Sequence, residues 1–113
     1  RLVRLPYHLS SLTQAAALAA IEHSGDLLAT VEQIKVQRER ISAAAVEFGL
    51  TVQPSDANFV LVSGVKDPEA IFEKLLERGV LIRNVGIPNS LRLTAGTEAE
   101  TTKLIAELGL LLD

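Results

Sequence analysis

The strongest constraint on the fold of this chain is a long helical pattern over residues 26–48. Its apolar positions are separated by three or four residues, and once by seven: Leu27, Val31, Ile34, Ile41, Ala45 and Phe48. This is the periodicity of an α-helix. Asp26 is expected to open the helix, Gly49 to end it, and Lys35 to pair with Glu39 on its polar side. At roughly 1.5 Å per residue the helix is about 30 Å long, so it is expected to run along a small domain or to bridge to a neighbour.

A shorter helix is predicted before the long one. Residues 1–10 are expected to be extended or looped, because Pro6 disfavours helix in the residue before it. Ser11 and Gln14 then have the spacing of a capping box, in which two side chains satisfy free backbone N–H groups at a helix start. The alanine-rich residues that follow give this helix a thin apolar face that another element can approach closely. Gly25 is expected to interrupt it.

The second half of the chain alternates strand-like and helical segments. Strands are predicted at residues 50–53, 58–63, 80–83 and 91–95. Residues 58–63 are almost continuously apolar, which favours a central strand covered on both faces. In residues 91–95, apolar residues alternate with Arg92 and Thr94, so these two side chains are expected to face away from the buried side.

Two further helices have start signals in the sequence. Asp67 followed by Pro68 predicts an N-cap residue and a proline in the first helical position. Thr97 and Glu100 have the spacing of a second capping box. Gly79 is expected to end the first of these helices.

These elements predict an α+β fold in the order α-α-β-β-α-β-β-α. The long N-terminal helices are expected to pack with a small mixed β-sheet in a two-layer arrangement. A length of 113 residues suggests a single domain over residues 1–113.

Composition narrows the classes of function. The net charge of −3 gives no broad attraction for nucleic acid or an anionic membrane, and no apolar run approaches the roughly 20 residues of a membrane span. The absence of cysteine excludes disulfides, thiol nucleophiles and cysteine-based zinc sites, and it fits a cytoplasmic location. The first residue is Arg1 rather than Met, which suggests a piece of a longer protein.

Two arginines are the most informative candidates for a functional site. Arg83 ends one apolar strand-like segment and Arg92 interrupts another, with the short loop 84–89 between the segments. A guanidinium group presents a flat fork of N–H donors that matches two oxygens of a carboxylate or phosphate. Two such groups on adjacent strands are expected to bind a small anionic molecule.

The other polar side chains indicate no reaction chemistry of their own. His8 and His23 have no metal-ligand spacing to an acid or to each other, so a structural role is favoured for His23. His8 and Tyr7, in the loop before the first helix, are candidates to line a cleft. The lysines, all expected on helix surfaces or in a turn, are Lys35, Lys66, Lys74 and Lys103. None has the buried setting that a Schiff-base lysine needs, and the scattered glycines form no phosphate-binding loop.

Four stretches resemble the C-terminal part of histidinol-phosphate aminotransferases. They are Leu5-Pro-Tyr-His-Leu-Ser-Ser-Leu-Thr-Gln14, Ser55-Asp-Ala-Asn-Phe-Val-Leu61, Gly79-Val-Leu-Ile-Arg83 and Leu91-Arg-Leu-Thr-Ala-Gly-Thr97. Their order and intervals fit over essentially the whole chain. The second and fourth are shared by many pyridoxal-phosphate enzymes of fold type I, whereas Pro-Tyr-His-Leu-Ser and Arg-Asn-Val-Gly-Ile-Pro are similar to the histidinol-phosphate branch.

The resemblance implies a role in histidine biosynthesis. Enzymes of this family are homodimers that move an amino group between glutamate and imidazole-acetol phosphate, so that histidinol phosphate and 2-oxoglutarate are the other pair of reactants, through a lysine-bound pyridoxal 5'-phosphate. The chain would be the small C-terminal domain together with the helix at about 26–48 that connects it to a large domain. The cofactor lysine would belong to that large domain, so this chain alone is expected to be inactive and to bind no cofactor covalently.

The resemblance also implies roles for particular residues. Arg92 would bind the α-carboxylate of glutamate or 2-oxoglutarate, and Arg83 would help to bind the substrate phosphate. Asn58 would support the site. Many family members have Asn at the position of His8, which leaves a substrate contact there in doubt.

Three alternatives remain open on the sequence. The chain could belong to an aromatic amino-acid aminotransferase or to a threonine-phosphate decarboxylase, whose motifs are similar. It could be a stand-alone regulatory module that senses an anionic metabolite. It could also be an interaction domain that uses its alanine-rich helix face.

Overall fold

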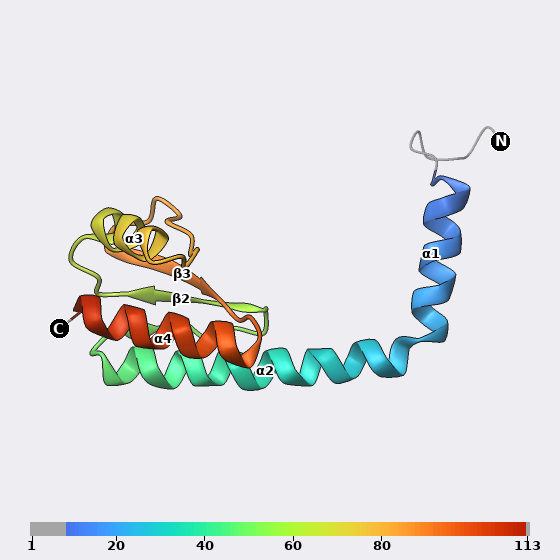
Figure 1. Ribbon diagram of the computed structural model, residues 1–113, viewed down its shortest axis with the longest axis horizontal. Coiled ribbons are helices and arrows are strands. Elements are labelled where there is room, and N and C mark those ends of the chain that lie inside the picture. The colour runs from blue at the N-terminus through green and yellow to red at the C-terminus, as the bar shows by residue number, and fades with distance from the viewer. Residues whose placement is uncertain (1–8, 113) are drawn as a thin grey trace. The chain divides into compact units, whose positions relative to one another are not determined.

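The computed structural model describes residues 9–112, and that range contains four helices and three strands (Figure 1). The elements are α1 (Ser11–Glu22), α2 (Ser24–Glu47), β1 (Thr51–Val52), β2 (Phe59–Ser63), α3 (Pro68–Glu77), β3 (Ser90–Thr94) and α4 (Glu98–Leu112). The α+β class and the order of the elements are therefore confirmed, with one change at residues 80–83. No helix among residues 9–112 is both long enough and apolar enough to cross a membrane.

The chain divides into two compact units, Arg1–Val31 and Glu32–Asp113. The first unit contains α1 and the first part of α2, and every residue described in it is exposed. Ser10 caps α1, with its hydroxyl oxygen accepting from the N–H of Thr13 at 3.1 Å. The predicted capping box one residue later, at Ser11 and Gln14, was therefore wrong, because Ser10 is the residue whose extended backbone precedes the first helical turn.

The break between α1 and α2 lies at His23 rather than at the predicted Gly25. Gly25 is the second residue of α2. Glycine is costly mainly in a helix interior, and the first turn of a helix already lacks intrahelical partners for its N–H groups. Gly25 is therefore tolerated inside α2.

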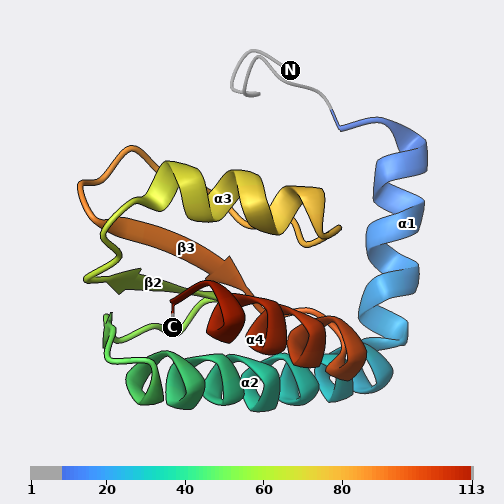
Figure 2. The same ribbon diagram turned by 60° about the vertical axis from the view of Figure 1, so that its left-hand side comes forward.

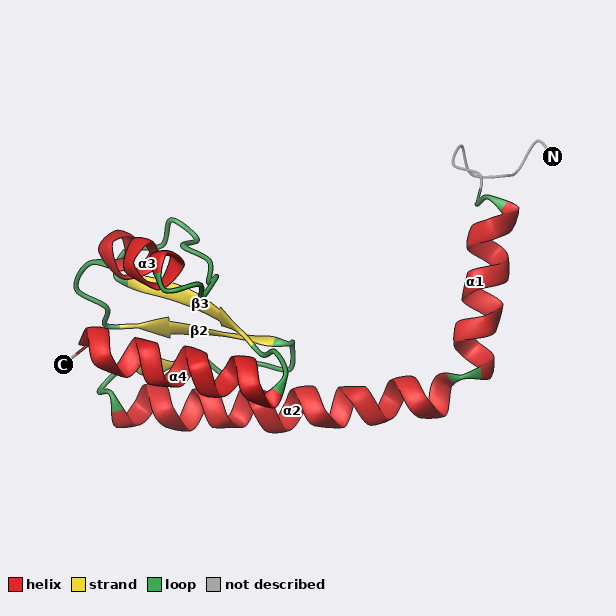
Figure 3. Ribbon diagram, in the orientation of Figure 1, coloured by secondary structure: helices red, strands yellow, loops and turns green. Residues whose placement is uncertain are grey.

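The second unit is built on an antiparallel sheet with the strand order β1-β2-β3. Strands β2 and β3 are drawn in yellow in Figure 3. β2 and β3 lie side by side and pair from Phe59 with Thr94 to Ser63 with Ser90 (Figure 2). The prediction of a mixed sheet was wrong. Residues 80–83 turn back through a short loop beside β3, so they meet it antiparallel, and they contribute one isolated bridge instead of a fourth strand.

The hydrophobic core lies on one face of the sheet. Val60 and Val62 of β2 and Leu91 and Leu93 of β3 are at most 1 % exposed. The helical residues in the same cluster are Ile41, Ala45, Ile71, Leu75, Leu104 and Leu108. The sheet and its helices thus form the two predicted layers. β2 is central as predicted, but its other face, with Phe59 and Leu61, is only half-buried among the described residues.

Local signals set the ends of the helices as predicted. The Asp67 carboxylate accepts from the N–H of Ala70 at 3.0 Å and caps α3. Gly49 and Gly79 have φ angles of +79° and +72° after α2 and α3, which is the left-handed conformation that glycine adopts at low cost. The N–H of Leu50 then reaches back to the carbonyl of Ala45 at 2.9 Å.

One predicted ion pair on α2 was wrong. Lys35 pairs with Glu32 at 2.6 Å, and Glu39 pairs with Arg38 at 3.0 Å. Residues three apart are as close on a helix surface as residues four apart. The helical spacing therefore allowed Lys35 to pair with either Glu32 or Glu39. In the structure Glu39 pairs with the neighbouring Arg38, and Lys35 pairs with Glu32.

Candidate functional site

The structure brings Arg83 and Arg92 directly opposite each other. The N–H of Arg83 donates to the carbonyl of Arg92 at 3.1 Å, and the N–H of Arg92 donates to the carbonyl of Arg83 at 2.9 Å. Residues that exchange both hydrogen bonds in an antiparallel pair have Cα atoms about 5.5 Å apart and side chains on the same face. Both guanidinium groups therefore belong to the sheet face opposite the core.

Alternating burial explains why both side chains face that way. In β3, Leu91 and Leu93 are fully buried, so Arg92 between them must face outward. In the bridging segment, Val80 and Ile82 are 8 % and 6 % exposed, which turns Arg83 away from the core in the same manner. The predicted alternation along residues 91–95 is thus confirmed.

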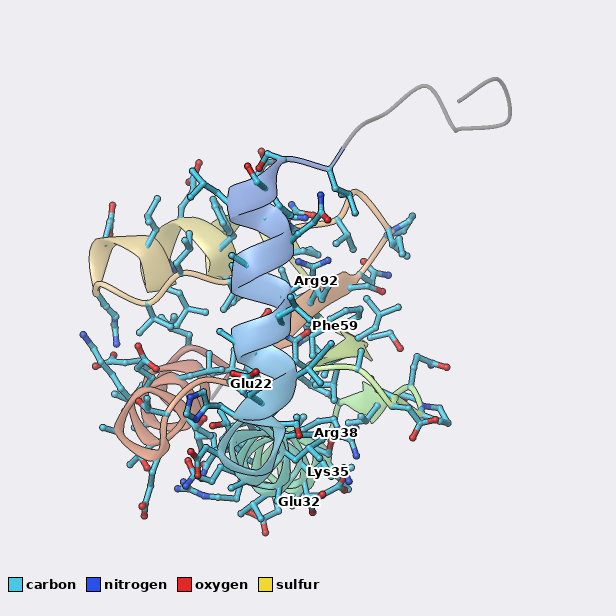
Figure 4. All side chains as sticks on the ribbon, turned by 90° about the vertical axis from the view of Figure 1, so that its right-hand side faces the viewer. Glu22, Glu32, Lys35, Arg38, Phe59 and Arg92 are labelled. Carbon is cyan, nitrogen blue, oxygen red and sulfur yellow. The ribbon has the colours of Figure 1, made fainter. Side chains whose placement is uncertain are left out.

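Arg92 lies against an aromatic ring. Its Cζ atom is over the ring of Phe59, 4.6 Å from the ring centre (Figure 4). Arg92 pairs across the sheet with Leu61, and Phe59 is two residues from Leu61 on the same face, a diagonal distance that long side chains can span. The Nε atom of Arg92 is buried and has no hydrogen-bond partner among the described residues.

Arg83 has a different environment. It is exposed, and it lines a cavity of about 580 Å³ together with Glu69, Phe72 and Asn84, among others. Arg92 is not part of that lining. Because Arg92 leans over β2 and the Arg83 segment lies on the other side of β3, the two groups present separate donors on one face rather than one enclosed pocket.

Neither arginine makes an ion pair with any acid in the described part of the chain, where the ion pairs involve Lys35, Arg38 and Arg78. Buried or half-buried cations in proteins are normally paired. Arg92 thus combines partial burial with a charge that no acid described here neutralises. This arrangement suits a negatively charged ligand.

Asn58 lies at the start of β2, beside Phe59. It is exposed, and its backbone carbonyl accepts from the N–H of Ala95 at 2.8 Å, which ties the start of β2 to the end of β3. Its backbone is therefore held next to the end of β3 that follows Arg92. Tyr7 and His8, the other expected cleft residues, lie outside the described residues.

The turn before Asn58 belongs to one of the stretches that carry the resemblance, but its hydrogen bonds were not predicted from the sequence. The hydroxyl of Ser55 donates to the carbonyl of Phe59 at 2.5 Å and accepts from the N–H of Ala57 at 3.1 Å. From α2, an Nη atom of Arg38 donates to the carbonyl of Ala57 at 3.2 Å. A serine hydroxyl commonly accepts from the N–H two residues later in a turn, so the bond between Ser55 and Ala57 could have been predicted. The contact from Arg38 comes from 19 residues away, and no short motif predicts it.

After β3 the chain enters α4, and the capping box predicted at the start of this helix, Thr97 with Glu100, is confirmed. The carboxylate of Glu100 accepts from the N–H of Thr97 at 2.7 Å and from its hydroxyl at 2.8 Å. These hydrogen bonds favour the ionised form and hold the pKa of Glu100 below its ordinary value.

The residues present limit the chemistry that this segment can perform. Residues 9–112 contain no group of three or more side chains that could hold a metal ion. Lys35, Lys66, Lys74 and Lys103 are all exposed. A lysine that forms a Schiff base requires a desolvated or otherwise activating setting. The described residues therefore suit anion binding and do not fit a covalently held pyridoxal cofactor.

Comparisons with known proteins agree with this description. The chain is 57% identical over its whole length to the histidinol-phosphate aminotransferase of Paenarthrobacter aurescens, and 52% identical over 93% of its length to that of Mycolicibacterium smegmatis. It spans 30% and 28% of those proteins. The crystal structure of histidinol-phosphate aminotransferase from Sinorhizobium meliloti in complex with pyridoxal-5'-phosphate matches 97% of this chain with a TM-score of 0.80 and 31% identity, and the chain covers 32% of it. Residues 1–108 match the family described as aminotransferase class I and II, and the chain belongs to that family.

Proposed function

We propose that this chain is the substrate-anion-binding segment of a pyridoxal-phosphate-dependent aminotransferase that acts on histidinol phosphate. The reaction would convert L-histidinol phosphate and 2-oxoglutarate into imidazole-acetol phosphate and L-glutamate, a step in histidine biosynthesis. The observation that carries the proposal is the backbone bridge between Arg83 and Arg92. It presents two guanidinium groups, neither paired with a described acid, on one face of the sheet.

Within this proposal the two arginines have different tasks. Arg92, held against Phe59, binds the carboxylate of glutamate or 2-oxoglutarate through its two terminal nitrogens. Arg83, which is more exposed, contacts the phosphate of the other substrate. A transaminase binds two substrates in turn in the same site. Two fixed guanidinium groups on one face can bind the anionic group of either substrate without a rearrangement of the site. Asn58, Tyr7 and His8 are supporting residues in the same proposal.

The cofactor belongs to the proposal but not to the chemistry of this chain. Pyridoxal phosphate supplies the electron sink that transamination requires, and parts of the longer protein outside this chain would hold it. Binding of the substrate anion by this segment would draw it toward the cofactor and help to exclude water. The longer protein would act as a homodimer in the cytoplasm, as expected for this family.

Substitution of Arg92 in the longer protein tests the proposal. Arg92→Ala is expected to lower kcat/KM for glutamate by an amount that corresponds to roughly 3–5 kcal/mol of transition-state stabilisation. The reason is that the substrate carboxylate would be left unpaired in a closed site. Arg78→Ala is the matched control: Arg78 forms an ion pair with Glu107 at 2.8 Å and has no part in the site. An unchanged kcat/KM for glutamate in Arg92→Ala would refute the proposal.

Substitution of Arg83 separates the histidinol-phosphate reaction from its closest alternative. Arg83→Ala is expected to weaken turnover of a phosphorylated substrate more than turnover of an aromatic amino acid without phosphate. An equal loss for both would favour an aromatic amino-acid aminotransferase, because Arg83 would then have no phosphate to recognise.

A further inference from the structure

Arg92 has two neighbourhood features that the proposed carboxylate contact does not explain. Its buried Nε atom has no hydrogen-bond partner within residues 9–112, and its Cζ atom lies over the ring of Phe59. A buried donor without a partner is normally costly and requires an explanation. We propose that Phe59 is a positioning residue that holds the guanidinium group of Arg92 in the orientation that binds the substrate carboxylate.

The ring is suited to this task because of where it contacts the cation. An aromatic face attracts a guanidinium group through its negative quadrupole, and arginine stacks on such faces by its plane. The N–H donors lie in that plane and remain available at the terminal nitrogens. A carboxylate partner would occupy those same donors and compete with the substrate. Phe59 therefore offsets the charge of Arg92 while leaving its binding edge open.

The backbone around Phe59 is fixed on both sides. The Ser55 hydroxyl holds the carbonyl of Phe59 at 2.5 Å, and Arg38 holds the carbonyl of Ala57 at 3.2 Å. On the other side, Phe59 is paired with Thr94 of β3. A ring attached to so constrained a segment has little freedom to move, so it can restrict the rotamers of Arg92 before any substrate arrives. Such pre-organisation lowers the cost of binding.

The inference rests on the proposed function, because it assumes that Arg92 binds a carboxylate. It makes a separate claim about how Arg92 is held. If Phe59 only fills space, its removal should lower stability as any half-buried aromatic does. If it positions Arg92, its removal should specifically weaken the recognition of the carboxylate.

Kinetics of the longer protein distinguish these possibilities. Phe59→Leu is expected to raise KM for glutamate roughly fivefold to thirtyfold, the range that corresponds to a partly desolvated cation–π contact, with kcat within about twofold. Phe59→Tyr keeps the aromatic face and, because Phe59 is half-buried, its hydroxyl can reach solvent, so KM should stay near that of the unmodified protein. Phe48→Leu is the matched control, since Phe48 packs beside Gly109 of α4 and should leave KM unchanged.

A spectroscopic measurement on the chain itself gives a second readout. In ¹⁵N-resolved NMR spectra, the Nε–H signal of Arg92 is expected to be shifted by the ring and protected from solvent exchange. Phe59→Leu should remove the ring-induced shift, whereas Phe59→Tyr and Phe48→Leu should keep it.

The outcomes separate the two proposals. The positioning role is overturned if Phe59→Leu leaves KM and the Nε–H signal unchanged, or if Phe59→Tyr behaves as Phe59→Leu does. If Arg92→Ala weakens glutamate binding while Phe59→Leu does not, the positioning role fails and the proposed function stands. If Arg92→Ala has no effect, both fail.

Discussion

Neutralising Arg83 is expected to stabilise the isolated chain. Arg83 and Arg92 are directly opposite on one face of an antiparallel pair, and like charges in that position destabilise a sheet. Glu69 lines the same cavity as Arg83, but neither arginine forms an ion pair with an acid among the described residues, where the ion pairs are those of Lys35, Arg38 and Arg78. Arg83→Gln keeps a long polar side chain and the backbone bridge, and it removes one of the two charges.

The size of the effect follows from the geometry. The Cα atoms of such a pair are about 5.5 Å apart, but Arg92 leans over Phe59 on the far side of β3 from Arg83. If the guanidinium groups are about 8–10 Å apart in a solvent-like dielectric, their repulsion is about 0.4–0.5 kcal/mol. Arg83→Gln should therefore raise the free energy of unfolding by about this amount at low salt. In 1 M NaCl the Debye length is roughly 3 Å, so the gain should nearly vanish.

Urea unfolding followed by far-UV circular dichroism provides the assay, because the chain has no Trp and one Tyr and gives little fluorescence signal. At an m-value of roughly 1–1.5 kcal/mol/M, the urea midpoint of Arg83→Gln should rise by about 0.3–0.5 M. Arg78→Gln is the matched control with the opposite sign. It breaks the pair with Glu107, so it should leave stability unchanged or lower it by up to about 1 kcal/mol.

The reasoning is refuted if Arg83→Gln is no more stable than the unmodified chain at low salt, or if its gain persists in 1 M NaCl. Either result would mean that the two charges do not interact across the bridge. Unfolding in the presence of inorganic phosphate provides an independent measurement. Phosphate should stabilise the unmodified chain more than Arg83→Gln, because a ligand that binds only the folded state raises stability and the variant retains one of the two donors.

Further predictions concern stability and cofactor binding. Gly49→Ala should destabilise the chain by about 1 kcal/mol, because position 49 is left-handed (φ +79°) with open space around it, while Gly49→Asn should cost less in the same urea assay. The pKa of Glu100 is lowered in the folded chain, so its stabilising contribution is present above its ordinary pKa near 4.5 and is lost as the pH falls through the lower folded value. Glu100→Gln should flatten the acid limb of a stability-against-pH curve. Pyridoxal phosphate added to the chain should give no stoichiometric, site-specific aldimine absorbance, because the described lysines are exposed; a one-to-one signal at one lysine would contradict this.

The features that sequence reasoning predicted are those encoded within a few residues. Two capping signals have their hydrogen-bond partners within three residues: they are Asp67 before a proline, and Thr97 with Glu100. A third signal, Gly49 at the end of a helix, depends on the conformational preference of glycine itself. The errors arose where several partners were equally close. Lys35 had acids at three and four residues' distance, and the apolar segment at residues 80–83 could have paired with β3 in either direction.

The contact between Phe59 and Arg92 shows a different limit. The sequence places both residues on strands, but whether they meet depends on the register of β2 against β3. A register shift of one residue turns a whole set of side chains to the other face. The register is set by the burial of Val60 and Leu93 and their neighbours, which is a property of the assembled core rather than of any short motif.

The meeting of Arg83 and Arg92 requires two separate conditions, and only one of them is contained in the strands. The burial of Val80 and Ile82 on one side, and of Leu91 and Leu93 on the other, decides which face each arginine occupies. That facing would survive a change in the length of the loop between them. The loop decides that the two residues are opposite: Ser90 bonds back to Ile87 at 3.2 Å and Asn89 adopts a φ of +54°, which returns the chain with Arg83 beside Arg92. A loop that imposed a register shifted by two residues would therefore keep both charges on the open face, because the side-chain period of a strand is two. It would offset the two charges along the sheet and separate the phosphate contact from the carboxylate contact without unfolding the core.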